Sequence, residues 1–196
     1  MNTNLDQTYW NDRHNNNDTP WEIGTVSPAI KAYIDQWKDK KSRVLIPGAG
    51  HHHEAAYLLE CGFEDITICD ISPIAISNMK THLPVSSHIT YNVGDFFDLD
   101  GSYDLILEQT FFCALDPTLR NHYVDKMTAL LTKNGTLAGL LFATHFDKDG
   151  PPFGGTIEEY KALFDKKLHI LSIDMCYNSI APRSSNELFF ICKKYK

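Results

Sequence analysis

The sequence predicts an α/β fold built on a seven-stranded, mostly parallel sheet that ends in an antiparallel hairpin. From residue 43 onward, short apolar runs alternate with stretches of helical spacing, which is typical of strands joined by helices. The last two apolar runs, 168–174 and 188–192, have no convincing helical stretch between them. Because parallel strands need a long crossover connection, this final pair is expected to be antiparallel.

The elements are delimited by boundary signals. Ser27-Pro28 and Ser72-Pro73 each open a helix, because serine caps helices and proline suits the first turn. Gly62 is typical of a helix C-cap, and Asn134-Gly135 of a turn. The expected strands are residues 43–47, 65–70, 89–93, 103–108, 136–143, 168–174 and 188–192; the expected helices are residues 28–37, 51–61, 73 onward, 116–131 and 156–164. Only one helix is expected before residue 43.

Composition narrows the class of protein. A length of 196 residues suits one domain, and a net charge of −7 disfavours nucleic acid as a partner, since phosphates are repelled. The five cysteines are odd in number and lack C-x-x-C spacing, which favours a reducing compartment. No apolar run reaches the roughly 18 residues of a membrane helix, and residues 1–17 lack the features of a signal peptide. We expect a cytoplasmic monomer or weak homodimer without membrane contact.

A glycine turn and a carboxylate point to a nucleoside-bearing ligand. Gly48 and Gly50 follow the first strand of the predicted sheet, and Asp70 ends the second about twenty residues later. Glycines allow close backbone approach, and such a carboxylate can accept hydrogen bonds from ribose hydroxyls. His53 occupies the third glycine position of a dinucleotide fingerprint, so S-adenosylmethionine, which has no phosphate, fits better than NAD. A plain strand-to-helix turn is the alternative.

A second acidic residue follows the third strand. In Gly94-Asp95-Phe96, Asp95 could accept a hydrogen bond from an adenine amino group while Phe96 packs on the ring. Alone, the pair is equally consistent with a turn aspartate and a core phenylalanine. At the same sheet edge as Asp70, the ligand-binding interpretation is favoured.

The chain as a whole resembles the thiopurine methyltransferase family, and within it the plant-type thiol and halide methyltransferases. The similarity runs in order along nearly the whole chain, in Tyr9-Trp10, Thr19-Pro20-Trp21-Glu22 with Gly24, Pro47-Gly48-Ala49-Gly50, Asp70-Ile71-Ser72, Gly94-Asp95-Phe96-Phe97, Tyr103-Asp104-Leu105-Ile106, Thr110-Phe111-Phe112-Cys113-Ala114-Leu115 and Gly150-Pro151-Pro152-Phe153. The resemblance implies a Rossmann-like class I methyltransferase fold and S-adenosylmethionine as cofactor. It also implies a small soft nucleophile as acceptor: a thiol, bisulfide, halide or related chalcogen compound.

The resemblance further implies how the chain is organised. Residues 1–42 would form a segment that covers the cofactor, and residues 43–196 the methyltransferase domain. Trp10 and Trp21 would close the pocket, with Trp21 near the methyl donor, where an aromatic face favours a sulfonium cation. The cofactor-binding set would be Trp10, Trp21, Gly48, Gly50, His51, Asp70, Ile71, Asp95, Phe96 and Thr110.

Candidates on the acceptor side come from the loop after the fourth strand, because ligands lie beyond the carboxyl ends of strands in open α/β sheets. They are Glu108, Thr110 and Phe111; of Phe111 and Phe112, one ring is expected in the core. Arg183, in the turn between the last two strands, could hold an anionic acceptor or be a surface arginine.

Three histidines, His51 to His53, stand at the expected start of a helix. Adjacent side chains there point in different directions, so a shared metal is not expected. His51 is the best candidate of the three to contact the carboxylate of the cofactor.

Methyl transfer from a sulfonium depends mainly on alignment, and a thiolate or iodide needs no general base. Three alternatives stay open at this point: an O- or N-methyltransferase on the same scaffold, an NAD-binding oxidoreductase, and a non-catalytic module that kept the fold.

Overall fold

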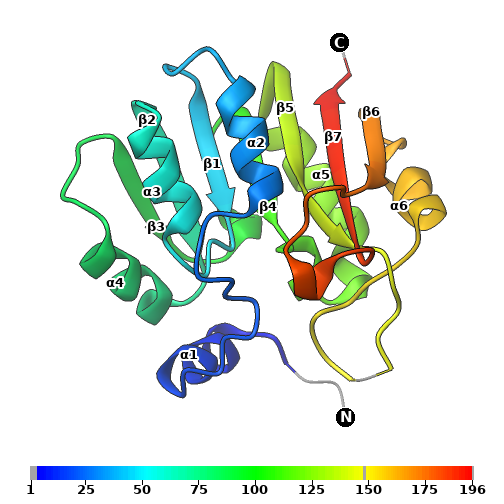
Figure 1. Cartoon of the computed structure of the whole chain (residues 1–196), viewed down its shortest axis with the longest axis horizontal. Helices are drawn as coiled ribbons and strands as arrows, with labels where there is room; N and C mark the ends of the chain where they lie inside the picture. Colours follow the sequence, from blue (N-terminus) through cyan, green and yellow to red (C-terminus); the bar gives the residue numbers. More distant parts are fainter. Residues whose placement is uncertain (1–3, 148, 196) are drawn as a thin grey trace.

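One mixed sheet forms the centre of the molecule (Figure 1). The computed structural model describes residues 4–147 and 149–195. Its strands are β1 (Arg43–Pro47), β2 (Asp65–Asp70), β3 (Ile89–Val93), β4 (Tyr103–Gln109), β5 (Leu131–Phe142), β6 (Leu168–Met175) and β7 (Glu187–Lys194), in the order β3-β2-β1-β4-β5-β7-β6. Strands β1 to β5 are parallel, and β7 is antiparallel to both β5 and β6. The predicted fold is confirmed.

Helices cover both faces of the sheet. They are α1 (Gln7–Asn15), α2 (Pro28–Gln36), α3 (His53–Glu60), α4 (Pro73–His82), α5 (Arg120–Leu130) and α6 (Ile157–Phe164). Successive side chains of a strand point to opposite faces, so Val44 joins a core with α2, α3 and α4, whereas Leu45 joins a second core with α5 and α6. Burial on both faces explains why the strands appear in the sequence as continuous apolar runs.

Helix α1 was not expected, and the prediction of a single helix before residue 43 is wrong. Its start is capped by Asp6, which accepts a hydrogen bond from the Tyr9 amide at 3.0 Å. The helix has no apolar stripe and only one buried side chain, His14, so periodicity could not reveal it. Polar contacts attach it instead to the region before α4: Gln7 donates to the Ile71 carbonyl at 3.0 Å, and Ser72 bonds to Asn11 at 2.7 Å.

The segment from residue 116 to residue 143 differs from the prediction at its centre. The expected helix is split into a short 3-10 turn, Pro117–Leu119, and α5, and β5 begins at Leu131 rather than at residue 136. Leu131 pairs with Tyr103, and an irregularity in the β4–β5 register follows. Residues 131–135 are therefore strand, not helix end and turn. Helix α3 also begins two residues later than predicted, at His53; the other boundaries agree within about two residues.

The parallel strands all end at one edge of the sheet, and α1 lies across this edge (Figure 1). The carboxyl ends of β1 to β4 and the segments that follow them contain most of the candidate residues, so the topology gathers them here. No helix in the described part of the chain is long and apolar enough to cross a membrane.

Candidate cofactor and acceptor site

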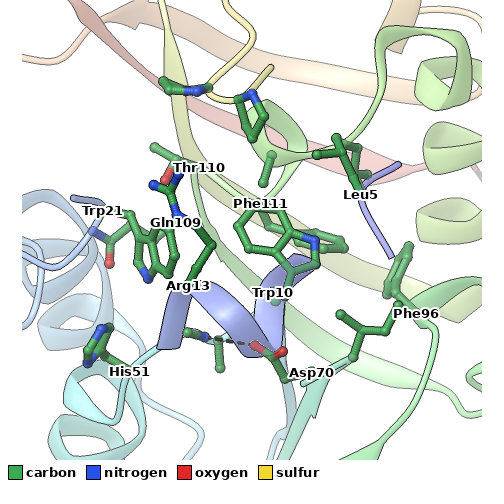
Figure 2. Close-up of a pocket in the computed structure, with 18 of the residues that line it drawn as sticks. Leu5, Trp10, Arg13, Trp21, His51, Asp70, Phe96, Gln109, Thr110 and Phe111 are labelled. Carbon is green, nitrogen blue, oxygen red and sulfur yellow. Dashed lines mark hydrogen bonds between the residues drawn. The ribbon is translucent and has the colours of Figure 1, made fainter. Parts of the chain in front are cut away.

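A cavity of about 710 Å³ opens at this edge, bounded by α1, by residues 20–23 and by the loops after the strands (Figure 2). Twelve of the thirteen candidate residues line it: Trp10, Trp21, Gly48, Gly50, His51, Asp70, Ile71, Asp95, Phe96, Thr110, Phe111 and Arg183. The sequence therefore located the cavity correctly. Glu108 is the exception and does not line it.

The glycine turn after β1 brings backbone close to the cavity. Gly48 and Gly50 have φ angles of 55° and 58°, in the left-handed region that favours glycine. A Cβ on Gly48 would lie 2.0 Å from Cδ2 of Phe111, and one on Gly50 would lie 3.0 Å from Nε1 of Trp21. Both positions therefore require glycine, because aromatic rings occupy the space that a side chain would need.

Asp70 is fixed at the tip of β2 by two backbone amides. The Gly50 amide donates to Oδ2 at 3.0 Å, and the Ser72 amide donates to Oδ1 at 2.8 Å. Burial raises the pKa of Asp70, and these two hydrogen bonds act in the opposite direction. A carboxylate can accept about four hydrogen bonds, so each oxygen keeps acceptor capacity toward the cavity. This arrangement fits the ribose diol of an adenosine.

Asp95 and Phe96 form the wall beyond Asp70. Asp95 is exposed, and its Oδ1 accepts from the Phe97 amide at 2.9 Å. Phe96 is buried, and its ring meets that of Phe111 edge to face at 5.2 Å. The exposed Asp95 carboxylate and the Phe96 ring therefore stand together on the side of the cavity where an adenine would lie if Asp70 holds the ribose.

An aromatic lid lies over the glycine turn. The rings of Trp10, from α1, and Trp21 meet edge to face at 5.5 Å, and the guanidinium of Arg13 lies 5.5 Å from the centre of the Trp21 ring. Arg13 also pairs with Asp18 at 3.2 Å. Figure 2 shows Trp10, Arg13 and Trp21 converging on one cavity. Both tryptophans were predicted from the sequence, whereas Arg13 was not, because it lies in the unpredicted helix α1.

Arg183 links Trp21 to the terminal hairpin through a hydrogen bond and an ion pair. Its Nη2 donates to the Trp21 carbonyl at 2.8 Å, and its Nη1 lies 3.2 Å from the buried carboxylate of Glu187. The guanidinium also lies 5.5 Å from the centre of the Phe142 ring. Arg183 is thus neither isolated on the surface nor free of partners, although it does line the cavity.

The loop after β4 supplies the opposite wall. Thr110 has a φ angle of 59°, an uncommon conformation for a β-branched residue that stores strain of about 1–3 kcal/mol. Its amide donates to the Leu140 carbonyl at 3.2 Å. Phe111 faces the cavity, whereas Phe112 is fully buried, so the expectation that one of the two rings joins the core is confirmed.

Glu108 requires a correction, because it was expected on the acceptor side. Its side chain is fully buried behind the loop, and Oε1 accepts from the Phe112 amide at 2.5 Å. Oε2 is buried without a hydrogen-bond partner, and a Cβ on Gly139 would lie 3.0 Å from it. Burial raises the pKa of Glu108 to about 8. The side chain points into the core because Glu108 still lies within β4, where alternation places it on the same face as Ile106.

The histidines divide into separate environments. His51 and His53 both contact Glu22, the latter at 2.7 Å, while His52 stacks on His82 with ring centres 4.7 Å apart. The ring centres of His14, from α1, and His51 lie 5.9 Å apart. Burial lowers the pKa of His14 to about 4. Across residues 4–147 and 149–195, no group of three or more His, Cys, Asp or Glu side chains is placed to hold a metal ion.

Comparisons with known proteins agree with this geometry. The sequence matches the thiopurine S-methyltransferase family over residues 5–188. It is 28% identical over 175 residues to a probable thiol methyltransferase 2 of Arabidopsis thaliana, covering 86% of this chain and 77% of that protein. It is 25% identical over 186 residues to a thiopurine S-methyltransferase of Acinetobacter baylyi, covering 82% and 84%.

The fold is shared with solved methyltransferases. The Burkholderia thailandensis 1,6-didemethyltoxoflavin-N1-methyltransferase, crystallised with S-adenosylhomocysteine, superposes with a TM-score of 0.78 at 16% identity, covering 97% of this chain and 87% of that one. The NAD-binding alternative loses its support, since the family match leads to methyl transfer. This chain belongs to the thiopurine S-methyltransferase family and is an S-adenosylmethionine-dependent methyltransferase.

Proposed function

We propose that this chain transfers a methyl group to a small soft nucleophile: a thiol, bisulfide, halide or related chalcogen compound. The observation that carries the proposal is the orientation of Glu108. The only carboxyl group within the stretch 108–113 turns away from the cavity, so this loop offers Thr110 and Phe111 to the acceptor instead of a general base. A thiolate or halide needs no proton removed by the enzyme, whereas an unactivated alcohol does.

In this proposal the residues bind and align. Asp70 holds the ribose of S-adenosylmethionine. The Gly48–Gly50 turn lets the protein backbone approach the cofactor closely, and Asp95 and Phe96 contact the adenine. The bound cofactor supplies an electrophilic methyl group on a sulfonium. Trp10 and Trp21 exclude water from that region, and holding both reactants in line can contribute several kcal/mol.

The acceptor side is mainly apolar. Beyond Phe111, the cavity is lined by Leu115, Phe146, Pro151 and Pro152, with Asp116 and Thr118 as polar members. Apolar walls suit the hydrocarbon part of an organic thiol, which a halide ion lacks, so organic thiols are expected to be better acceptors than halides.

The remaining expectations belong to the same proposal. Residues 1–42 act as the covering segment of the site and residues 43–196 as the catalytic domain. The five cysteines are free thiols, which fits a cytoplasmic protein. A monomer or weak homodimer is part of the same proposal.

A matched acceptor screen tests the proposal. Thiophenol, phenol and aniline share one ring and differ only in the nucleophilic atom; bisulfide and iodide extend the series. Formation of S-adenosylhomocysteine is measured at constant pH. The proposal expects turnover with thiophenol and bisulfide, and none above background with phenol or aniline. Turnover restricted to phenol or aniline would assign the chain to O- or N-methylation instead.

A further inference from the structure

Glu22 and His51 form a carboxylate–imidazole pair in the wall of the cavity. Glu22 directly follows Trp21 in the lid, and its Oε1 accepts hydrogen bonds from the Gly24 amide at 2.6 Å and from Nε2 of His53 at 2.7 Å. Its Oε2 contacts Nδ1 of His51. Glu22 therefore links the lid to the glycine turn after β1.

The contact with Glu22 favours one tautomer of His51. Because a carboxylate oxygen can only accept, the contact is attractive when Nδ1 carries the hydrogen. In a neutral imidazole, Nε2 is then the acceptor. His51 lines the cavity, and its Nε2 is buried without a hydrogen-bond partner. A buried acceptor of this kind is unfavourable unless a donor reaches it.

The position of His51 indicates which part of the cofactor supplies that donor. Figure 2 shows Asp70 between His51 on one side and Phe96 on the other. If Asp70 takes the ribose and Phe96 lies on the adenine side, His51 faces the opposite end, which carries the amino acid. That end has one strong donor, the α-ammonium, and one acceptor, the α-carboxylate.

Resting on the cofactor assignment above, we propose that Glu22 and His51 form the recognition site for the α-ammonium group, with Nε2 of His51 accepting its hydrogen bond. Glu22 is a positioning residue that fixes the tautomer, and His51 is the residue that contacts the ligand. This assignment replaces the earlier expectation that His51 contacts the carboxylate.

The groups around His51 favour its neutral form. Burial lowers the pKa of His51, and the charges of His53 and His82 act in the same direction, while Glu22 opposes them. The neighbouring His14, with its pKa lowered to about 4, is also neutral. An ammonium therefore meets no cation at His51 near neutral pH. If His51 were instead an imidazolium, it would donate to the carboxylate.

Calorimetric titration with related ligands distinguishes the two assignments. The ligands are S-adenosylhomocysteine, its analogue without the α-amino group, its analogue without the α-carboxylate, and 5′-methylthioadenosine, which lacks the whole amino-acid end. The variant His51→Phe keeps a ring but removes the acceptor. The control is His52→Phe, since His52 stacks on His82 and does not line the cavity.

The proposal expects His51→Phe to bind S-adenosylhomocysteine about tenfold or more weakly, as for loss of a hydrogen bond to a charged group. The same variant should bind the desamino analogue and 5′-methylthioadenosine as the wild type does, and His52→Phe should match the wild type throughout. Wild-type affinity should fall as the pH drops through the pKa of His51, below 6.5, because the protonated ring can no longer accept.

Three results would overturn the proposal. In the first, His51→Phe and His52→Phe bind S-adenosylhomocysteine equally. In the second, His51→Phe binds the carboxylate-free analogue as tightly as the wild type does; in the third, wild-type affinity rises on acidification. The second and third would assign the carboxylate to an imidazolium. If the wild type bound 5′-methylthioadenosine and S-adenosylhomocysteine equally weakly or not at all, the cofactor assignment itself would fail.

Discussion

Replacing Glu108 by glutamine should change how stability depends on pH. The side chain is fully buried, and burial raises the pKa of Glu108 from an ordinary value of 4.5 to about 8. Between these two values the native state keeps a proton that the unfolded state has released. Stability is therefore full below pH 4.5 and is lost progressively as the pH rises toward 8.

The expected loss of unfolding free energy follows from how far the pKa of Glu108 is raised. Each pH unit in this window corresponds to about 1.4 kcal/mol, so between pH 5 and pH 8 the wild type should lose about 3–4 kcal/mol of unfolding free energy relative to Glu108→Gln. Glutamine is neutral at every pH and keeps an oxygen for the Phe112 amide. Other buried carboxyl groups, such as Asp70, are common to both proteins and cancel in the difference.

Urea unfolding, followed by tryptophan fluorescence at several pH values from 5 to 8.5, measures this difference. The exposed Glu158→Gln serves as the control and should follow the wild type. If the unfolding free energies of Glu108→Gln and of the wild type differ by the same amount at every pH in this range, the argument from burial is refuted. Methyl transfer by Glu108→Gln should also persist at pH 7, because Glu108 lies behind the cavity; its abolition in a stable variant would restore Glu108 as a general base.

Three further predictions concern the cavity wall. Gly48→Ala should reduce activity by at least tenfold, because its Cβ would lie 2.0 Å from Phe111. The control Gly94→Ala, whose Cβ would have its nearest contact at 3.6 Å, should fold and bind S-adenosylhomocysteine. Equal activity and equal binding of the two variants would contradict the close packing at Gly48. Thr110→Gly should be about 1 kcal/mol more stable than Thr110→Ala in thermal unfolding, since alanine keeps the left-handed strain. Trp21→Leu should lower the affinity for S-adenosylmethionine more than the affinity for S-adenosylhomocysteine, as measured by calorimetry. Only the former carries a sulfonium, whose contact with an aromatic face contributes about 0.5–2 kcal/mol. An equal loss of affinity for both would show that Trp21 does not contact the sulfonium.

The sheet and the cavity could be predicted because both depend on local patterns. Strands buried on both faces give unbroken apolar runs, and a parallel sheet gathers the residues after its strands at one edge. This is why Gly48, Asp70, Asp95 and Thr110, which are far apart in the sequence, were predicted to line one pocket.

The failures arise where tertiary contacts decide the structure. Helix α1 lacks an apolar stripe, so its pattern does not distinguish it from a loop. It is held by the hydrogen bond that Gln7 donates to the Ile71 carbonyl and by the one that Asn11 accepts from the Ser72 hydroxyl. Glu108 was predicted to end its strand, but β4 continues to Gln109. Its side chain therefore follows the alternation of the strand, on the same face as Ile106 in the core. Glu22 lies within a recognised motif, yet its contact with His51 spans 29 residues and cannot be derived from spacing alone.

The account depends most directly on Asp70 as a ligand of the cofactor. Calorimetric titration of S-adenosylhomocysteine into the wild type, Asp70→Asn and the exposed control Asp98→Asn tests this role, with thermal unfolding to confirm that each variant is folded. We predict binding by the wild type and Asp98→Asn, and binding at least tenfold weaker in Asp70→Asn, because an amide loses one charged acceptor. Equal affinities in all three proteins, or no binding in any of them, would contradict the account.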